Sequence, residues 1–472
     1  MRRALAQVKA SDRFANMFEF RLDMIANPGI GKLLSSTRKP TIATCRPRRQ
    51  GGRFAGSERD RLGVLLLASS LGAKFVDIEI DVPNEPLAAF LGGRSKVILS
   101  CHMTNLPDSS LHRLYTEMHE TGADVVKLAY GVNDAADIHY AIEFLTYAAK
   151  DNRNAIAVAI GDAGDASRIL YKRFGGWATY AASEDGGQAA AGQLRGSTLR
   201  RLYRADRLTR STRIFGVIGN PLAQSKGVHV HNPLFQRQRQ DSVYCKFPVR
   251  NLSRFMHRVA PHLAGFSVTI PHKEHILDYV DLVDKAGESI GAVNTVVRRN
   301  GRLFGTNTDA LGALDAIEKK TRVRGKVMLI LGAGGAARAI AYEARQRGAR
   351  VIVANRTQGR AQVLADDLHV QSVDVRDIPG TYFDVLVNAT PVGMTPANGT
   401  PISAKLLRNK IVFDAVYNPP LTKLLRDARA SGATTISGTD MYVNQALLQS
   451  FLYTGTMHRS SLVKRLLQAA GG

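Results

Sequence analysis

The sequence predicts an α/β protein, with a (β/α)8-type barrel in the first half and a Rossmann-type dinucleotide-binding domain later. Two observations predict this. Residues 1 to about 208 repeat short apolar strands that end in polar residues, separated by helical stretches at the spacing of such barrels. Residues 327–357 contain a strand, a Gly-rich turn, a helix and a second strand. This βαβ unit has the size that binds a dinucleotide.

Composition narrows the class of protein. The chain has 472 residues, enough for two to four domains with substantial cores. Its cysteines are too few and too scattered for a disulfide framework or a metal cluster, which favours a reducing compartment, here the cytoplasm. No apolar run reaches transmembrane length, and the basic N-terminus MRRALAQVK lacks the apolar core of a secretory signal. We therefore expect no membrane partner.

The chain is strongly basic, with a formal net charge of +24. Its arginines are dispersed and do not form runs with interleaved aromatic residues, as nucleic-acid-binding segments often do. The charge therefore indicates anionic small ligands rather than nucleic acid.

Polar residues end the expected strands of the first half, where barrels carry their chemistry. The expected strands are 17–22, 41–44, 75–80, 97–100, 125–128, 156–160 and 177–181. The polar residues at or near their ends are Glu19, Arg21, Arg46, Asp77, Glu79, His102 and Lys127.

Lys127, in GADVVKLAY, lies inside an apolar strand. Loss of hydration there favours the neutral amine, which can attack a carbonyl. The alternative is a lysine that pairs with a carboxylate inside the barrel. His102 ends the preceding strand and is a candidate general base beside such a lysine. Arg46 and Arg168 are candidates to bind a substrate carboxylate, which arginine can hold with two hydrogen bonds.

Several segments of this half resemble type I 3-dehydroquinate dehydratase, in the same order: FEFRLD, TCRPRRQGGRFAGSE, SCH, GADVVKLA, GDAGDASRI and AAAGQ. The resemblance implies that Lys127 forms a Schiff base with the substrate ketone. His102 would remove the C2 proton and assist loss of the hydroxyl. The residues implied to bind substrate or shape its site are Glu19, Arg21, Arg46, Arg168 and Gln193.

Three departures from that family bear on activity. Gln50 stands where the family has a glutamate that holds the histidine. We expect it to hydrogen-bond to the His102 imidazole without supplying negative charge. Ala191 replaces the proline usual before Gly192, and the family's first barrel strand has no counterpart. The barrel is therefore expected to lack its first strand.

After a basic connector that ends at Arg213, polar residues again follow short apolar runs. Ser225 lies in IFGVIGNPLAQSKGVHV, Lys273 in GFSVTIPHK, Asn294 in IGAVNTVV and Asp309 in GTNTDALG. Lys273 and Asp309 are candidates for a proton-transfer pair. The alternative is a surface salt bridge.

The Gly-rich turn predicts where a pyrophosphate would bind. Its glycines allow a tight turn and let backbone N–H groups approach the phosphates at the helix N-terminus. The residues of this turn are Gly332, Ala333, Gly334, Gly335 and Ala336.

The end of the next strand bears on the choice of cofactor. An NAD site usually has an acidic residue there for the ribose hydroxyl. This chain has Asn355, Arg356 and Thr357, followed by Arg360. A cation at this place favours the 2′-phosphate of NADP(H). The alternative is a solvated arginine in an arginine-rich protein.

The motifs of the second half closely resemble shikimate dehydrogenase, and the match continues through GAGGAARA, NRT, VNATPVGM, DAVYNPPLT and GTDMYVNQA. The resemblance implies that Lys273 and Asp309 are the catalytic pair. The residues implied to hold substrate are Ser225, Thr269, Asn294, Tyr417 and Gln445. The nicotinamide end would lie near Gly438 and Met441.

One departure concerns substrate choice. The family's Ser-x-Ser-Pro reads Ser225-Lys226-Gly227-Val228, so one hydroxyl contact is missing at Gly227. The added space would lie near the carboxylate-bearing carbon of the substrate, where quinate has an extra hydroxyl. We therefore expect measurable quinate oxidation.

The two resemblances predict a fusion of both activities, without a metal because the histidines show no ligand spacing. The expected domains are a dehydratase barrel at 1–208, a substrate domain at 213–312, an NADP domain at 313–438 and a helical segment at 439–472 that returns to the substrate domain. One alternative is a quinate/shikimate dehydrogenase with an inactive barrel. Another is a non-catalytic ligand sensor or repressor, which an intact Lys273–Asp309 pair argues against.

Overall fold

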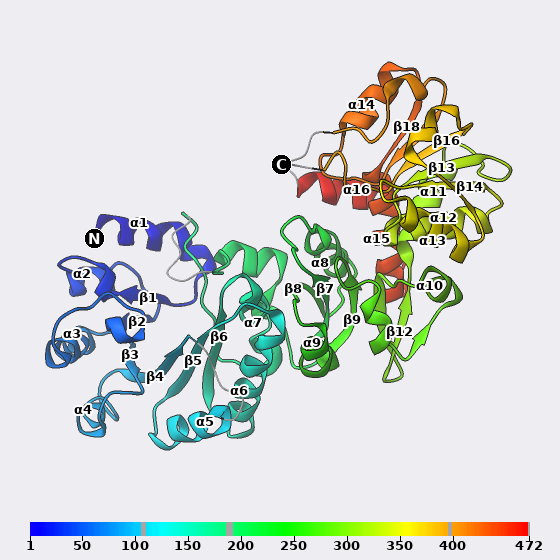
Figure 1. Ribbon diagram of the computed structural model, residues 1–472. Helices are drawn as coiled ribbons and strands as arrows, with labels where there is room; N and C mark the ends of the chain where they lie inside the picture. Colours follow the sequence, from blue (N-terminus) through cyan, green and yellow to red (C-terminus); the bar gives the residue numbers. More distant parts are fainter. Residues whose placement is uncertain (105–109, 186–191, 395–398, 471–472) are drawn as a thin grey trace. The chain divides into compact units, whose positions relative to one another are not determined.

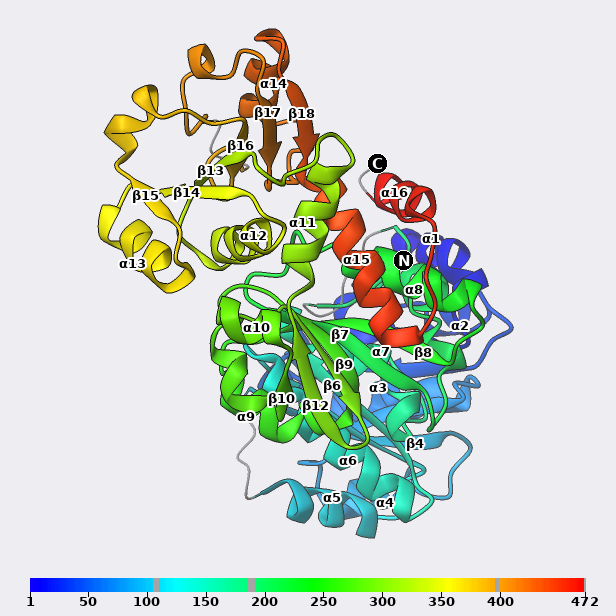
Figure 2. The ribbon, with the colours of Figure 1, turned by 90° about the vertical axis from the view of Figure 1, so that its right-hand side faces the viewer.

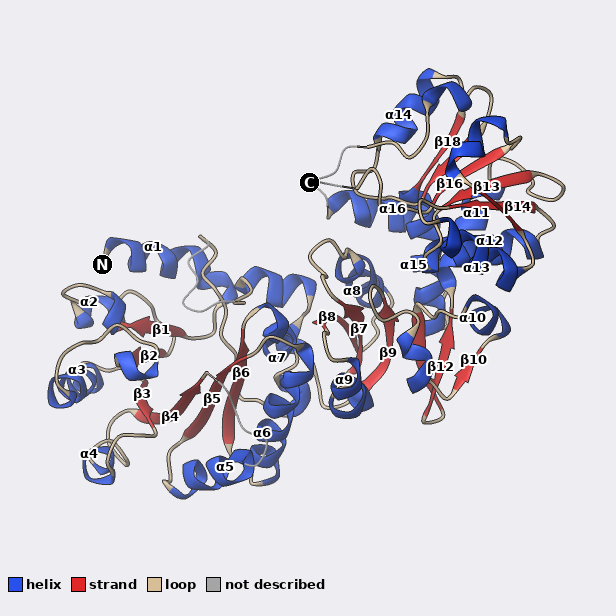
Figure 3. Cartoon of the chain, in the orientation of Figure 1, coloured by secondary structure: helices blue, strands red, loops and turns tan. Residues whose placement is uncertain are grey.

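The computed structural model describes residues 1–104, 110–185, 192–394 and 399–470. The chain divides into two compact units, residues 1–214 with 235–262, and residues 215–234 with 263–472. It contains three six-stranded sheets, drawn in red in Figure 3. Within the described ranges, no helix is both long and apolar enough to cross a bilayer.

The first sheet is parallel, and its strands lie side by side in chain order from β1 to β6 (Figure 1). Its strands are β1 (Phe18–Arg21), β2 (Thr41–Thr44), β3 (Phe75–Glu79), β4 (Lys96–Met103), β5 (Val125–Gly131) and β6 (Asn154–Ile160). The α-helices of this part are α1 (Arg2–Ser11), α2 (Ile30–Leu34), α3 (Glu58–Ser70), α4 (Asn84–Ala88), α5 (Leu111–Glu120), α6 (His139–Lys150) and α7 (Asp165–Ile169). Most of them connect consecutive strands, as a parallel sheet requires.

The described strands β1 to β6 form an open sheet, so the predicted (β/α)8-type barrel is not confirmed. Residues 177–181, predicted as a strand, are not one. The N–H of Trp177 donates to the carbonyl of Ala155 at 2.8 Å, which lays this segment beside β6. Among the described strands, none pairs with the free edges of β1 and β6.

Side chains alternate between the two faces of the sheet, which fixes where its polar residues lie. One face carries an apolar cluster that includes Phe75, Val125 and Ala129, with Tyr180 packed against it. Lys127 lies between Val125 and Ala129 along β5 and so points to the same face. The register pairs Ser100 with Lys127 on the adjoining strands.

The second sheet is mixed, in the order β10-β12-β11-β9-β7-β8. Its strands are β7 (Arg213–Gly219), β8 (Ser242–Pro248), β9 (Leu263–Val268), β10 (Leu282–Val283), β11 (Thr295–Arg299) and β12 (Arg302–Thr306). The α-helices of this part are α8 (Gly227–Arg237), α9 (Leu252–Arg258) and α10 (Lys285–Ile290).

The third sheet is parallel, in the order β15-β14-β13-β16-β17-β18, the doubly wound order of dinucleotide-binding domains. Its strands are β13 (Val327–Leu331), β14 (Arg350–Ala354), β15 (Gln371–Val373), β16 (Val385–Asn388), β17 (Ile411–Asp414) and β18 (Thr434–Ser437). The helices around it are α11 (Thr308–Glu318), α12 (Gly335–Gln346), α13 (Gln358–Leu368) and α14 (Lys423–Ala430).

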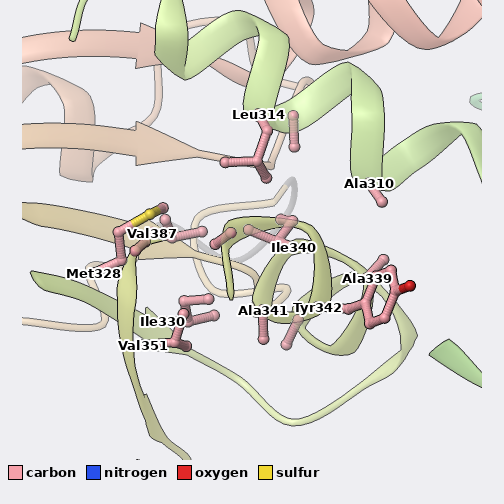
Figure 4. Close-up of a cluster of buried hydrophobic side chains, with 14 of the residues drawn as sticks. Ala310, Leu314, Met328, Ile330, Ala339, Ile340, Ala341, Tyr342, Val351 and Val387 are labelled. Carbon is pink, nitrogen blue, oxygen red and sulfur yellow. The ribbon is translucent and has the colours of Figure 1, made fainter. Parts of the chain in front are cut away.

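Both faces of this third sheet are covered, which explains the uninterrupted apolar run of β13. Met328 and Ile330 pack into one core together with Ile340 of α12 and Leu314 of α11 (Figure 4). The alternate residues of β13, such as Leu329, pack into a second core on the other face. The central strand is thereby held from both sides, which fixes the Gly-rich turn that follows it.

The last two helices, α15 (Gly438–Thr454) and α16 (Ser460–Ala469), pack together with α8. Helix α15 also runs beside α11 (Figure 2). A side chain at Gly312 of α11 would place its Cβ 2.9 Å from the backbone nitrogen of Gln445, so glycine permits this close approach. The packing brings the first turn of α11, with Asp309, near the residues of α15.

Candidate functional sites

The first candidate site surrounds Lys127, whose side chain is almost completely buried. Its Nζ lies 2.8 Å from Oδ2 of Asp77 and 3.9 Å from Oε1 of Glu19. The amine also lies over the ring of Tyr180, 4.4 Å from the ring centroid. The alternative raised by the sequence, a lysine that pairs with a buried carboxylate, therefore describes its resting geometry.

Arg46 completes this charged layer. Its guanidinium donates to Asp77 at 2.9 Å, to Glu79 at 2.6 Å and to Ser100 at 2.8 Å. Burial alone would raise the pKa of Asp77, but the charges of Arg46 and Lys127 outweigh burial and hold that pKa well below its usual range. Arg46 thus fixes the carboxylates around Lys127, and both of its terminal nitrogens already have protein partners.

His102 follows on β4. Burial, reinforced by the positive charges of Arg46 and Lys127, lowers the pKa of His102 well below its usual range. The imidazole is therefore neutral near pH 7, as a general base must be. Its Nδ1 is shielded from solvent and has no hydrogen-bond partner among the described residues.

Gln50 does not hold the imidazole, contrary to the expectation from the sequence. Its Oε1 accepts from the backbone N–H of His102 at 3.1 Å, and its Nε2 donates to Asp81 at 3.2 Å. The side chain bridges two strand ends because Asp81, an acceptor, lies beside it. Gln50 therefore fixes the backbone at His102 and does not bond to Nδ1 of the ring, which has no hydrogen-bond partner among the described residues.

The remaining predicted residues of this half differ in how they are held. Glu19 accepts from Thr44 at 2.8 Å, and Arg21 makes two hydrogen bonds to Asp23. Arg168 on α7 is buried, and its Nε and Nη2 have no partner among the described residues. Burial lowers the pKa of Arg168 to about 10. Arg46 and Arg168 are the two candidates to bind a substrate carboxylate, and of these Arg168 is the one whose guanidinium has N–H donors without a described partner.

Gln193 is buried. Ala191 lies outside the described residues. Sequence analysis missed Tyr180, because an aromatic residue in an expected strand usually indicates only core packing.

The second candidate site contains the predicted proton-transfer pair. Nζ of Lys273 lies 2.5 Å from Oδ2 of Asp309, and both side chains are partly shielded from solvent. Asp309 lies in the first turn of α11, where the side chain of Asn307 caps the helix and accepts from the Asp309 N–H at 3.1 Å. The carbonyl of Lys273 accepts from the N–H of Val293 at 2.8 Å. Both charges are thus held by fixed backbone.

Three more predicted residues gather near this pair. Asn294 accepts from the N–H of Thr308 at 2.8 Å, and its amide lies 3.5 Å from Oε1 of Gln445. Burial raises the pKa of Tyr417, and the negative charge of Asp309 adds to the effect, so Tyr417 lies within electrostatic reach of the pair.

The other predicted substrate residues lie in the segments that follow β7 and β9. The N–H of Thr269 donates to Ile218 at 2.9 Å, and a Cβ at Gly219 would lie 2.4 Å from Cγ2 of Thr269. Ser225 and Gly227 lie at the start of α8. No described hydrogen bond joins them to Lys273 or Asp309.

The Gly-rich turn leaves space in front of α12. Gly332 has a φ of +117°, a conformation that favours glycine. A Cβ at Gly334 or Gly335 would meet no atom within 4 Å, and no side chain caps this helix. Ala333 and Ala336 are half-buried on either side. The N–H groups of the first turn can therefore receive an anionic ligand.

The cations predicted to select NADP are exposed. Arg356 and Arg360 follow β14, and neither guanidinium has an ion pair or hydrogen bond with a described residue. The amide of Asn355 donates to the carbonyl of Thr357 at 3.0 Å, which shapes the turn. The turn thus presents two available guanidinium groups at the place where the ribose of a bound dinucleotide would lie.

Gly438 and Met441 lie at the start of α15. A Cβ at Gly438 would lie 2.5 Å from the carbonyl oxygen of Val416, so glycine permits the helix to begin against the loop that carries Tyr417. Met441 is buried. This contact links the third sheet to the residues near Lys273.

Three family models match the chain. They are type I 3-dehydroquinase over residues 1–210, the shikimate dehydrogenase substrate binding domain over 217–296, and shikimate/quinate 5-dehydrogenase over 315–394.

Individual proteins match as well. A bifunctional 3-dehydroquinate dehydratase/shikimate dehydrogenase from Arabidopsis thaliana, named as chloroplastic, is 38% identical over 95% of this chain and 79% of its own length. A shikimate dehydrogenase (NADP(+)) from Shouchella clausii is 37% identical over 54% of this chain and 98% of its own length. The crystal structure of the Thermus thermophilus enzyme with NADP(H) and shikimate covers 55% of this chain and 99% of its own, with 34% identity and a TM-score of 0.51.

Proposed function

Because this chain belongs to the family of bifunctional 3-dehydroquinate dehydratases/shikimate dehydrogenases, we propose that its two candidate sites catalyse the two reactions in turn. The chain dehydrates 3-dehydroquinate to 3-dehydroshikimate and reduces that product to shikimate with NADPH. The observation that carries the first activity is a buried amine, Lys127, near the neutral base His102. Steady-state assays with dehydroquinate, shikimate and quinate test this assignment.

In the dehydratase site, Lys127 would attack the substrate ketone. The nitrogen bonds to the carbonyl carbon, and the carbonyl oxygen leaves as water with the two hydrogens of the neutral amine. His102 would then remove the C2 proton and pass it to the C1 hydroxyl, which would leave as a second water molecule. Hydrolysis of the product imine would consume one water and free Lys127. The unused donors of Arg168 suit the substrate carboxylate.

We further propose that residues 1–208 correspond to a (β/α)8-type barrel. The parallel strands β1 to β6, which lie side by side in chain order, support this correspondence. Residues 213–312 would form the substrate domain and 313–438 the NADP domain, with 439–472 returning to the former. The shared core of α8, α15 and α16 supports the last assignment.

In the dehydrogenase site, bound NADPH supplies a hydride to the ketone carbon. Lys273 would donate a proton to the ketone oxygen, and Asp309 at 2.5 Å stabilises the charged lysine beforehand. Asn294, Gln445, Tyr417, Ser225 and Thr269 would orient the substrate hydroxyls and carboxylate. The open first turn of α12 would hold the pyrophosphate, and Gly438 and Met441 would border the nicotinamide.

Arg356 is expected to select NADP over NAD. Its guanidinium has no described partner to give up, and a charge-assisted hydrogen bond to the 2′-phosphate contributes about ten- to a hundredfold in affinity. Arg356→Ala should therefore raise the KM for NADP by that factor and leave the KM for NAD nearly unchanged. Arg376→Ala, an exposed arginine paired with Asp374, is the matched control. Equal losses for both cofactors would refute the role.

Gly227 is expected to admit quinate. The missing hydroxymethyl leaves space at the start of α8, so the chain should oxidise quinate measurably. Gly227→Ser should restore a hydroxyl donor and raise the ratio of kcat/KM for shikimate to that for quinate. A ratio that stays the same in this variant would count against the idea.

We propose that the chain works in the cytoplasm on small-molecule substrates. Its three cysteines, Cys45, Cys101 and Cys245, are buried free thiols, as suits a reducing compartment.

A further inference from the structure

The segment that begins at Trp177 crosses the face of the first sheet that carries Lys127. The N–H of Trp177 bonds to the carbonyl of Ala155, and the indole packs on Phe75 with ring centroids 5.2 Å apart. These two contacts pin the segment at its start. Tyr180, three residues later, is thereby held over the same face of the sheet, beside Lys127.

Tyr180 and Asp77 both contact the amine of Lys127. The phenol ring lies 4.4 Å from Nζ, and Asp77 accepts from Nζ at 2.8 Å. A molecule that bonds to this nitrogen would lie close to the tyrosine ring, which carries a para hydroxyl as its polar group.

The Tyr180 hydroxyl is shielded from solvent and has no hydrogen-bond partner among the described residues. Buried hydroxyls are rarely left in this state, because the lost hydration is not repaid. The charges that act on the phenol include Arg21, Arg46 and Asp77, and the same three act on His102. Two unpartnered polar atoms, Oη of Tyr180 and Nδ1 of His102, thus lie in one charged environment beside Lys127.

We propose that Tyr180 is a further catalytic residue of the dehydratase site. Its phenol donates a hydrogen bond to the ketone oxygen of the substrate while Lys127 attacks the adjoining carbon. The inference rests on the proposed Schiff-base function of Lys127. In this role, Tyr180 orients and polarises the carbonyl group of the substrate.

The phenol of Tyr180 neither gains nor loses a proton over the reaction. As the carbon–nitrogen bond forms, the ketone oxygen becomes a hydroxyl and then leaves as water, and Tyr180 keeps its own proton. Burial, with the negative charges of Glu19 and Asp77, raises the pKa of Tyr180 well above its usual value, so it remains a donor throughout the working pH range. The contact strengthens as negative charge develops on the oxygen.

Tyr180→Phe tests the proposal because it keeps the ring over Lys127 and removes only the hydroxyl. One neutral hydrogen bond corresponds to about three- to tenfold, so kcat/KM for dehydroquinate should fall by that factor. The rate at which borohydride traps the substrate on Lys127 should fall equally, while dehydrogenase activity stays unchanged. The unfolding temperature should not fall, because the lost hydroxyl had no protein partner.

Tyr115→Phe is the matched control. The hydroxyl of Tyr115 donates to Asp151 at 2.7 Å, so its loss should lower the unfolding temperature without changing the trapping rate. Unchanged kcat/KM and trapping rate in Tyr180→Phe would overturn the role of Tyr180 alone. A wild-type chain that traps no substrate on Lys127 would instead overturn the Schiff-base function, and the role of Tyr180 with it.

Discussion

Lys127→Arg should abolish dehydration of 3-dehydroquinate, with a loss in kcat of at least about 10⁴-fold. Losses of this size follow removal of a covalent nucleophile, and a guanidinium cannot form the imine. Arginine keeps a positive charge beside Asp77, so the buried carboxylate of Asp77 does not lose an ion-pair partner. The measurement is the initial rate of dehydroshikimate formation by absorbance.

The control for this variant is Lys150→Arg, at the end of α6 and exposed, which should keep full activity. Borohydride in the presence of dehydroquinate should mark the peptide that contains Lys127 in the wild-type chain and no peptide in Lys127→Arg. An adduct on a different lysine would show that the nucleophile is misassigned. Absence of any adduct, with full dehydrogenase activity, would mean that the first half is a scaffold.

Lys273→Ala should lower kcat for shikimate oxidation by about 10²–10⁴-fold, the usual contribution of a general acid–base residue. The KM for NADP should change little, because the predicted pyrophosphate site is the Gly-rich turn. Lys320→Ala, at an exposed position after α11, is the control. An unchanged kcat in Lys273→Ala would show that the pair with Asp309 is only a salt bridge.

The third sheet and the Lys273–Asp309 pair could be predicted because their signals are local. The run Val327–Leu331 is apolar at every position, since helices cover both faces of its strand. Gly332 marks a backbone conformation that favours glycine. Lys273 and Asp309 each follow an apolar run, and strand ends converge in such folds.

The charged layer around Lys127 could be predicted only in part, because it depends on register. The sequence indicated that Asp77, Arg46 and Lys127 lie at or near strand ends, but it did not show which of these side chains would be in contact. Parallel pairing sets β3 beside β4 and β4 beside β5, and this brings Asp77 within 2.8 Å of Lys127. The competing partner Asp81 also could not be foreseen, and it draws Gln50 away from the imidazole.

A (β/α)8-type barrel was predicted from the spacing of the strands and was not confirmed. Spacing counts strands but does not show whether the first and last can pair. Trp177 bonds to β6, but residues 177–181 form no strand in the described structure. Tyr180 therefore lies outside the strands of the sheet.

The central claim is that one chain performs two consecutive reactions, and a single-vessel assay tests it most directly. The purified chain is mixed with dehydroquinate and NADPH, and the absorbance of NADPH is followed while products are identified by mass spectrometry. The account predicts that NADPH is consumed and shikimate accumulates, and that Lys127→Arg forms no shikimate. Consumption of NADPH only when dehydroshikimate is supplied would contradict it.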